Sequence, residues 1–108
     1  MIYITIFQNQ DGIKEFNCIG HAEYADAGED IVCAAVSAIV INTINSLETF
    51  TSASFQTVTN SQEGLIDVDF SEKLSSEADL LMKSMILGLQ GIQKQYGEEF
   101  LRLDFREV

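Results

Sequence analysis

Short apolar segments with strand character occur in two pairs, and a turn signal separates the members of each pair. The four segments are Ile2–Phe7, Ile13–Gly20, Phe55–Asn60 and Leu65–Phe70. Asn9–Gly12 lies between the first two and contains an Asp-Gly step, which suits the positive φ of a tight turn. Ser61–Gly64 lies between the other two. The pattern therefore predicts two β-hairpins.

Two longer segments predict helices. Ile31–Leu47 is apolar on almost every face, and its length favours a helix over a strand. Ser76, followed three residues later by Asp79, is typical of the start of a second helix, and Gly97 marks its end. The apolar stripe of this second helix consists of Ala78, Leu81, Met82, Met85, Leu89, Ile92 and Tyr96. A helix that is apolar all round must be covered on several sides, so the first helix predicts a homodimer.

A last strand over Phe100–Phe105 completes the element order ββαββαβ. Hairpins that precede helices are typical of an α+β fold, so we expect a largely antiparallel sheet packed with two helices. The length of 108 residues and the lack of an obvious linker indicate a single domain over residues 1–108. The sequence contains no glycine-rich phosphate-binding motif, which argues against a nucleotide site.

The charge balance narrows the classes of partner. The net charge of −11 disfavours direct binding to nucleic acid and favours basic partners. Met1–Phe7 lacks the basic start of a signal peptide, and Ile31–Ile41 is too short to span a bilayer, so no membrane partner is expected. These features predict a cytoplasmic protein, in which Cys18 and Cys33 stay reduced.

The candidate chemistry lies at the two ends of one acidic loop. If Asp30 caps the first helix, Cys33 falls in its first turn, where unpaired N–H groups and the helix dipole favour a thiolate. His21 is the only histidine of the chain and follows a strand end. It could act as a general base for Cys33, or form an ion pair with its thiolate, if the loop folds back.

Simpler interpretations of the same residues stay open. A cysteine is often a small buried hydrophobe, and a lone histidine is often a surface residue. Cys18, His21 and Cys33 could also bind zinc, but no clear fourth ligand follows, so we expect no metal and no cofactor. Cys18 is expected to be buried in the core.

Gly20-His21-Ala22 and the segment Asp30–Ser37, with sequence DIVCAAVS, closely resemble the ribosomal-processing cysteine protease family Prp. The resemblance covers essentially the whole chain. It implies a cysteine protease with Cys33 as nucleophile, His21 as general base, and Gly20, Asp30 and Ser37 as signature positions. Asp30 could cap the helix or orient His21. Ser37 could bond back to the Cys33 carbonyl, or support the thiolate or the substrate.

The resemblance also implies a substrate. It is the N-terminal extension of a bacterial large-subunit ribosomal protein, cut after an aromatic residue, and residues 22–29 could form a lid over it, with Gly28 as a hinge. Two other functions remain. The chain could be a non-catalytic dimeric module that binds a basic ribosomal protein, or a thiol-dependent redox or acyl-transfer enzyme. The absence of a CxxC motif disfavours dithiol redox chemistry.

Overall fold

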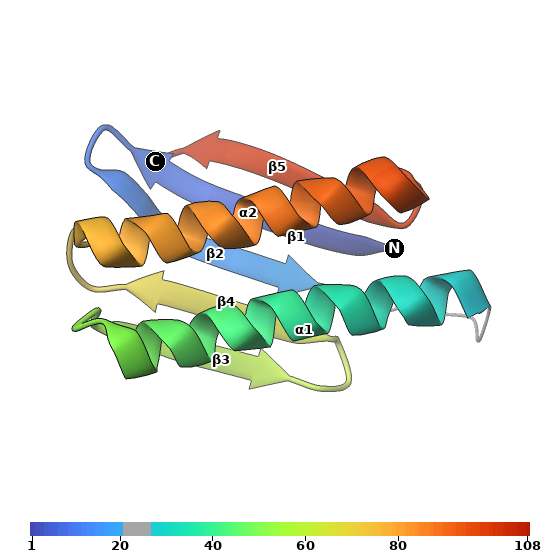
Figure 1. Ribbon diagram of the computed structural model, residues 1–108, viewed down its shortest axis with the longest axis horizontal. Helices are drawn as coiled ribbons and strands as arrows, with labels where there is room; N and C mark the ends of the chain where they lie inside the picture. The colour runs from blue at the N-terminus through green and yellow to red at the C-terminus, as the bar shows by residue number, and fades with distance from the viewer. Residues whose placement is uncertain (21–26) are drawn as a thin grey trace.

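The secondary structure follows the predicted order in the computed structural model, which describes residues 1–20 and 27–108 (Figure 1). The elements are β1 (Ile2–Asn9), β2 (Gly12–Ile19), α1 (Ala27–Phe50), β3 (Phe55–Asn60), β4 (Leu65–Phe70), α2 (Ser76–Tyr96) and β5 (Leu101–Glu107). The α+β class is thereby confirmed. The second hairpin has the predicted strand bounds, because its alternating segments end at strong turn residues.

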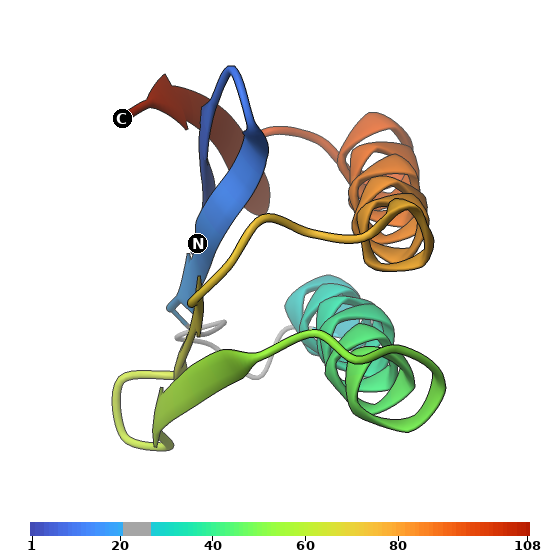
Figure 2. The same ribbon diagram turned by 90° about the vertical axis from the view of Figure 1, so that its left-hand side faces the viewer.

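The strands form one sheet in the order β3-β4-β2-β1-β5. Three neighbouring pairs are antiparallel and the pair β1–β5 is parallel, so the expected largely antiparallel sheet is confirmed. Both helices lie on the same face of the sheet, side by side (Figures 1 and 2). This arrangement leaves the other face of the sheet uncovered by any described element.

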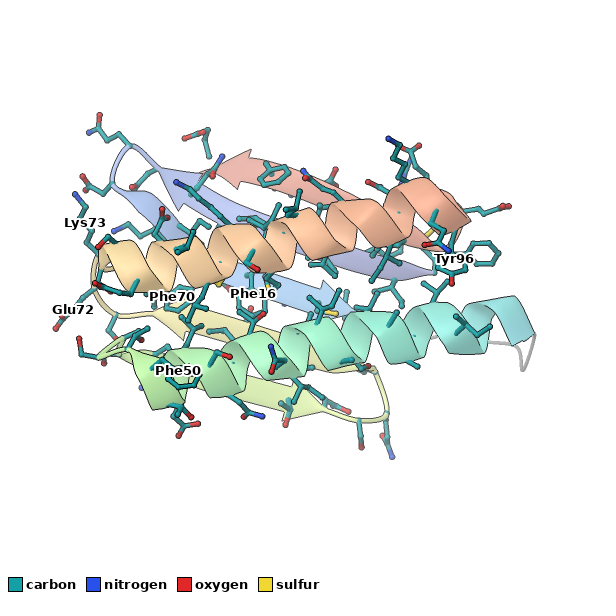
Figure 3. The ribbon with its side chains drawn as sticks, viewed as in Figure 1. Phe16, Phe50, Phe70, Glu72, Lys73 and Tyr96 are labelled. Carbon is teal, nitrogen blue, oxygen red and sulfur yellow. The ribbon has the colours of Figure 1, made fainter. Side chains whose placement is uncertain are left out.

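The core lies between the sheet and the two helices. Its fully buried side chains include Ile4, Ile6, Phe16, Val40, Leu47, Val68, Met82, Met85 and Leu89. Phe16 and Phe70 extend from the sheet into this layer, with their ring centroids 6.5 Å apart (Figure 3). The two methionines are core residues, as the helical stripe predicts.

Helix α2 begins at Ser76, as the sequence pattern predicts, but its N-cap residue differs. Ser75, and not Ser76, is the N-cap residue, because its hydroxyl oxygen accepts a hydrogen bond from the Ala78 N–H at 3.2 Å. The carbonyl of Ser75 accepts the Asp79 N–H at 2.9 Å. Gly97 ends the helix as expected, with a positive φ of 110°.

Helix α1 begins at Ala27, so the prediction that Asp30 is its N-cap is wrong. The extra turn consists of residues that are compatible with a helix, and Glu29 and Asp30 are favoured near the positive end of the dipole. Cys33 consequently lies in the second turn. Its backbone N–H comes after the four unpaired N–H groups at the helix start. The field of the helix dipole is therefore weaker at Cys33 than in the first turn, where the sequence predicts this residue to lie.

Helix α1 is also longer than the expected Ile31–Leu47. By length and composition alone, Ile31–Phe50 could cross a membrane, a test that a core helix of a soluble protein also passes. The prediction from Ile31–Ile41 that this segment is too short is therefore wrong. Val36 and Val40 are buried, whereas Ile41 is 48% exposed. The helix thus has a covered side and an apolar side that no described residue covers.

Gly20 ends β2 in a conformation that requires glycine. Its φ is +114°, and a Cβ built on it would overlap the carbonyl oxygen of Met1. Its N–H donates to the carbonyl of Glu63, in the turn between β3 and β4, at 3.1 Å. The end of β2 is therefore held between the chain start and the second hairpin.

Replacing Gly20 with alanine should destabilise the fold. The backbone strain alone costs about 1–3 kcal/mol, and the overlap with Met1 adds to it. Gly91→Ala is a matched control, since a Cβ at this helical position meets nothing within 4 Å and should stabilise by up to about 1 kcal/mol. Urea unfolding measures both. Equal midpoints for Gly20→Ala and the wild type would contradict this account.

The uncovered face of the sheet carries a cluster of three carboxyl groups on adjacent strands. Glu15 of β2 pairs with Asp69 of β4, and Asp67 lies two residues along the same strand. Asn17 donates to Asp67 at 3.1 Å. A hydrogen bond to Asp67, partial burial and the charges of Asp67 and Asp69 raise the pKa of Glu15 to about 7.

This cluster should make stability fall as the pH rises. The folded protein binds a proton at Glu15 more tightly than the unfolded chain does, because the pKa of Glu15 in the unfolded chain is 4.5. The resulting stabilisation is full below that value and is lost as the pH rises to about 7. Glu15→Gln should flatten this decline, whereas Glu72→Gln, outside the cluster, should not. Thermal melts between pH 5 and 8 with equal slopes for Glu15→Gln and wild type would refute the linkage.

Candidate active site

A groove of about 770 Å³ lies where α1 passes the end of β2 and the β3–β4 hairpin. Three of the predicted site residues line it, namely Gly20, Cys33 and Ser37. His21 directly follows Gly20 in the chain but lies outside the described residues, as do residues 22–26 of the expected lid. Gly28 of that expected lid is part of α1. The groove therefore brings the cysteine and the strand end before the histidine to one place.

Cys33 lies at the edge between the buried side of α1 and the groove. Its neighbours Val32 and Val36 are almost completely buried, and Cys33 itself is half-buried and packs against the core. Ser37 is exposed and follows Cys33 by one helical turn, so both side chains belong to the same face of α1. This position holds the sulfur on a rigid element and still leaves it open to the groove.

Cys18 reaches the same groove from the sheet side but has a different character. It is 6% exposed, and burial, followed by the charge of Cys33, raises the pKa of its thiol to about 11. Such a thiol stays protonated near neutral pH and is a poor nucleophile. The prediction that Cys18 is a buried packing residue is confirmed.

The β3–β4 hairpin forms the opposite wall of the groove, although its sequence predicts only a turn. Thr59, Asn60, Ser61, Gln62, Gly64 and Leu65 line this wall. The oxygen of the Asn60 side chain accepts N–H groups of Gln62 at 3.0 Å and Glu63 at 3.3 Å. The sequence predicts this turn but not its place in the site, because no spacing in the chain relates Asn60 to Cys33.

The inner end of the groove is apolar. Ile2, Val36, Val40 and Ile66 line it from β1, α1 and β4. The outer part carries the polar hairpin residues and Ser37. The groove can therefore accept one apolar side chain while polar groups contact an extended backbone beside the thiol.

Comparison with known proteins places these features in a family. The family model described as cysteine protease Prp matches residues 1–100. The ribosomal processing cysteine protease Prp of Bacillus subtilis is 36% identical over 103 residues, covering 89% of this chain and 90% of its own. Its counterpart in Staphylococcus aureus is 29% identical over 107 residues, covering 98% of this chain and all of its own.

Crystal structures of the S. aureus protease have the same fold. The complex with a substrate peptide superposes with a TM-score of 0.89 at 29% identity and covers 98% of this chain and all of that chain. The complex with a covalently linked product peptide gives a TM-score of 0.88 with the same identity and coverage. With a family model that spans nearly the whole sequence and a fold shared throughout, this chain belongs to the cysteine protease Prp family.

Proposed function

We propose that this cysteine protease removes the N-terminal extension of a bacterial large-subunit ribosomal protein, using Cys33 as nucleophile and His21 as general base. The observation that carries the proposal is the half-buried Cys33 on the wall of a groove of about 770 Å³, one turn before Ser37. The related S. aureus protease forms a covalent link to a product peptide and is described as a ribosomal processing protease. Both facts support a peptide substrate for this chain.

In the proposed reaction, the thiolate of Cys33 attacks the carbonyl carbon of the scissile peptide bond. The C–N bond then breaks as the protonated His21 gives its proton to the leaving amine, and a thioester remains on Cys33. Water, which loses a proton to His21, attacks the thioester and releases the acid product. Because Cys33 lies in the second turn of α1, a histidinium partner has to supply most of the stabilisation of its thiolate.

The apolar end of the groove supports cleavage after an aromatic residue. Leu65 and Ile66, which are only partly buried, offer hydrocarbon surface on which an aromatic ring loses contact with water. The polar part of the groove, lined by the hairpin residues and Ser37, offers hydrogen-bonding groups to the backbone after the cut. When the ring is buried, the carbonyl carbon of the same aromatic residue, which belongs to the scissile bond, lies beside Cys33.

Three further residues support the site in this proposal. Gly20 lets the chain pass close to the Met1 carbonyl and so supports the strand end before His21. Ser37 contacts the peptide or the thiolate from the face of α1 that carries Cys33. Asp30 lies three residues before Cys33 on the same helix, and its proposed role is to orient His21.

Charge and thiol state fit the proposed client and location. The net charge of −11 attracts a basic ribosomal protein and repels RNA, so recognition goes through the protein alone. The proposed location is the cytoplasm, where thiols such as those of Cys18 and Cys33 stay reduced. The reaction needs neither a cofactor nor a membrane.

Substitution at the dyad tests the proposed chemistry. Cys33→Ala should abolish cleavage of the extended ribosomal protein while peptide binding remains, because it removes only the attacking atom. His21→Ala should lower turnover by roughly 10²–10⁴-fold through loss of general acid–base catalysis. Cys18→Ala, which alters the other thiol of the groove, should leave the rate nearly unchanged. Mass spectrometry of the products measures all three rates. Cleavage by Cys33→Ala at the wild-type rate would end the assignment.

We further propose a homodimer formed through the uncovered face of α1. Ile31, Ala34, Ala38 and Ile41 lie on this face and are exposed. They recur at spacings of three and four and form one apolar stripe. A two-fold axis across the stripe would bury it against its own copy.

Sedimentation at micromolar concentration tests the dimer. The wild type should sediment at about twice the chain mass of 12.0 kDa. Ile41→Lys should shift it toward the monomer, because a charge would be buried in the interface. Val58→Lys is the control, since Val58 is also exposed but lies on the opposite face of the sheet. A wild type that sediments only as a monomer would contradict the proposal.

A further inference from the structure

We propose that Asn60 is a positioning residue for the active site, because its side chain fixes a turn that holds the strand end before His21. This inference rests on the proposed Cys33–His21 chemistry. It adds a residue from the second hairpin, which carries neither catalytic group. Each step of the connection is a hydrogen bond or a steric contact of described residues.

The first step is the turn itself. The Asn60 side-chain oxygen accepts two successive backbone N–H groups, from Gln62 at 3.0 Å and from Glu63 at 3.3 Å. The N–H of Gly64 donates to the carbonyl of Ser61 at 3.4 Å, a longer and weaker bond. Asn60 therefore makes the shorter contacts that define the shape of this turn.

The second step links the turn to β2. The carbonyl of Glu63 accepts the N–H of Gly20 at 3.1 Å. The β2–β4 ladder has its last pair at Cys18 and Ile66, so the bond to Gly20 lies beyond it. The hydrogen bond from the Gly20 N–H to the Glu63 carbonyl therefore joins the end of β2 to the second hairpin.

The third step is the narrow space around Gly20. The Met1 carbonyl lies so close that a Cβ would not fit, and the Glu63 carbonyl binds the N–H. Gly20, the last described residue before His21, is thus held by two backbone carbonyls. The same turn lines the groove opposite Cys33. A shift of the turn would therefore move the groove wall and the base-bearing strand end together.

The first hairpin provides a matched comparison. Asn9 is the last residue of β1, as Asn60 is of β3, and its side-chain oxygen accepts the N–H of Asp11 at 2.8 Å. The β1–β2 turn lies at the opposite end of the sheet from Gly20 (Figure 1). An asparagine with the same local role is therefore present where it cannot affect the site.

The experiment compares Asn60→Ala, Asn60→Asp and Asn9→Ala with the wild type. The probes are a peptide with an aromatic–small cleavage site and iodoacetamide, whose reaction at Cys33 is followed by mass spectrometry across pH. Asn60→Ala should lower kcat/KM by about 10- to 100-fold, since small displacements of catalytic groups have effects of this size. Alkylation of its Cys33 should slow at neutral pH, because a displaced His21 assists the thiol less. Asn60→Asp, which keeps the acceptor oxygen, should retain both properties, and so should Asn9→Ala.

Amide exchange at Gly20 gives a readout that does not depend on turnover. Exchange should accelerate in Asn60→Ala and stay slow in Asn60→Asp, provided that both variants melt cooperatively. Unchanged Gly20 exchange together with an unmoved alkylation profile in Asn60→Ala would overturn the positioning role. Equal losses in Asn60→Ala and Asn60→Asp would overturn it as well. A wild type that alkylates at Cys33 but cleaves no peptide would instead refute the proposed function.

Discussion

Burial of one face of the sheet beneath two helices is the constraint on which the rest of this structure depends. The inner face carries Ile4, Ile6 and Phe16, none of which is more than 1% exposed. The sheet can hide such residues only by placing α1 and α2 along the same side (Figure 2). Because α1 runs along the half of the sheet that holds β3 and β4 (Figure 1), its Cys33 lines one groove with the end of β2 and the turn of the second hairpin. The position of the thiol follows from core packing before any catalytic requirement is considered.

The site is built where three segments end or turn, and each is held by backbone contacts. Gly20 fits beneath the Met1 carbonyl only because it has no side chain. The Glu63 carbonyl reaches it from the adjacent hairpin, whose turn is shaped by Asn60. Groups on a rigid helix and on a strand end can be oriented more exactly than groups on a free loop. The arrangement is therefore suited to a nucleophile that depends on one partner side chain.

The two cysteines show how environment separates similar side chains. Cys18 and Cys33 line the same groove, yet Cys18 belongs to the central sheet and has a pKa raised to about 11. Cys33, on the helix, keeps contact with the groove. The same separation by environment occurs on the outer face, where the crowding of Asp67 and Asp69 raises the pKa of Glu15. Position in the fold therefore raises the pKa of Cys18 through burial and that of Glu15 through its carboxyl neighbours.

By itself, the sequence determined the class of the fold, because strand alternation, turn residues and helical stripes are local signals. Phe55–Asn60 and Leu65–Phe70 have the bounds that their pattern predicts. It also marked Cys33 and Gly20 through a motif, and that family relationship is confirmed over residues 1–100. Local signals were weaker at helix starts. The sequence placed the start of α1 after Asp30, whereas the helix continues back to Ala27, since helix-compatible residues extend beyond a good cap.

Only the tertiary structure decided what surrounds the thiol. The wall formed by Asn60 and its neighbours lies more than twenty residues from Cys33 in the chain, and no periodicity connects the two. The contact of Gly20 with Met1, and its bond to Glu63, likewise join segments that meet only after the sheet has formed. A local pattern reports which element a residue enters. Which elements become neighbours depends on burying the whole inner face at once, and that is a property of the complete chain.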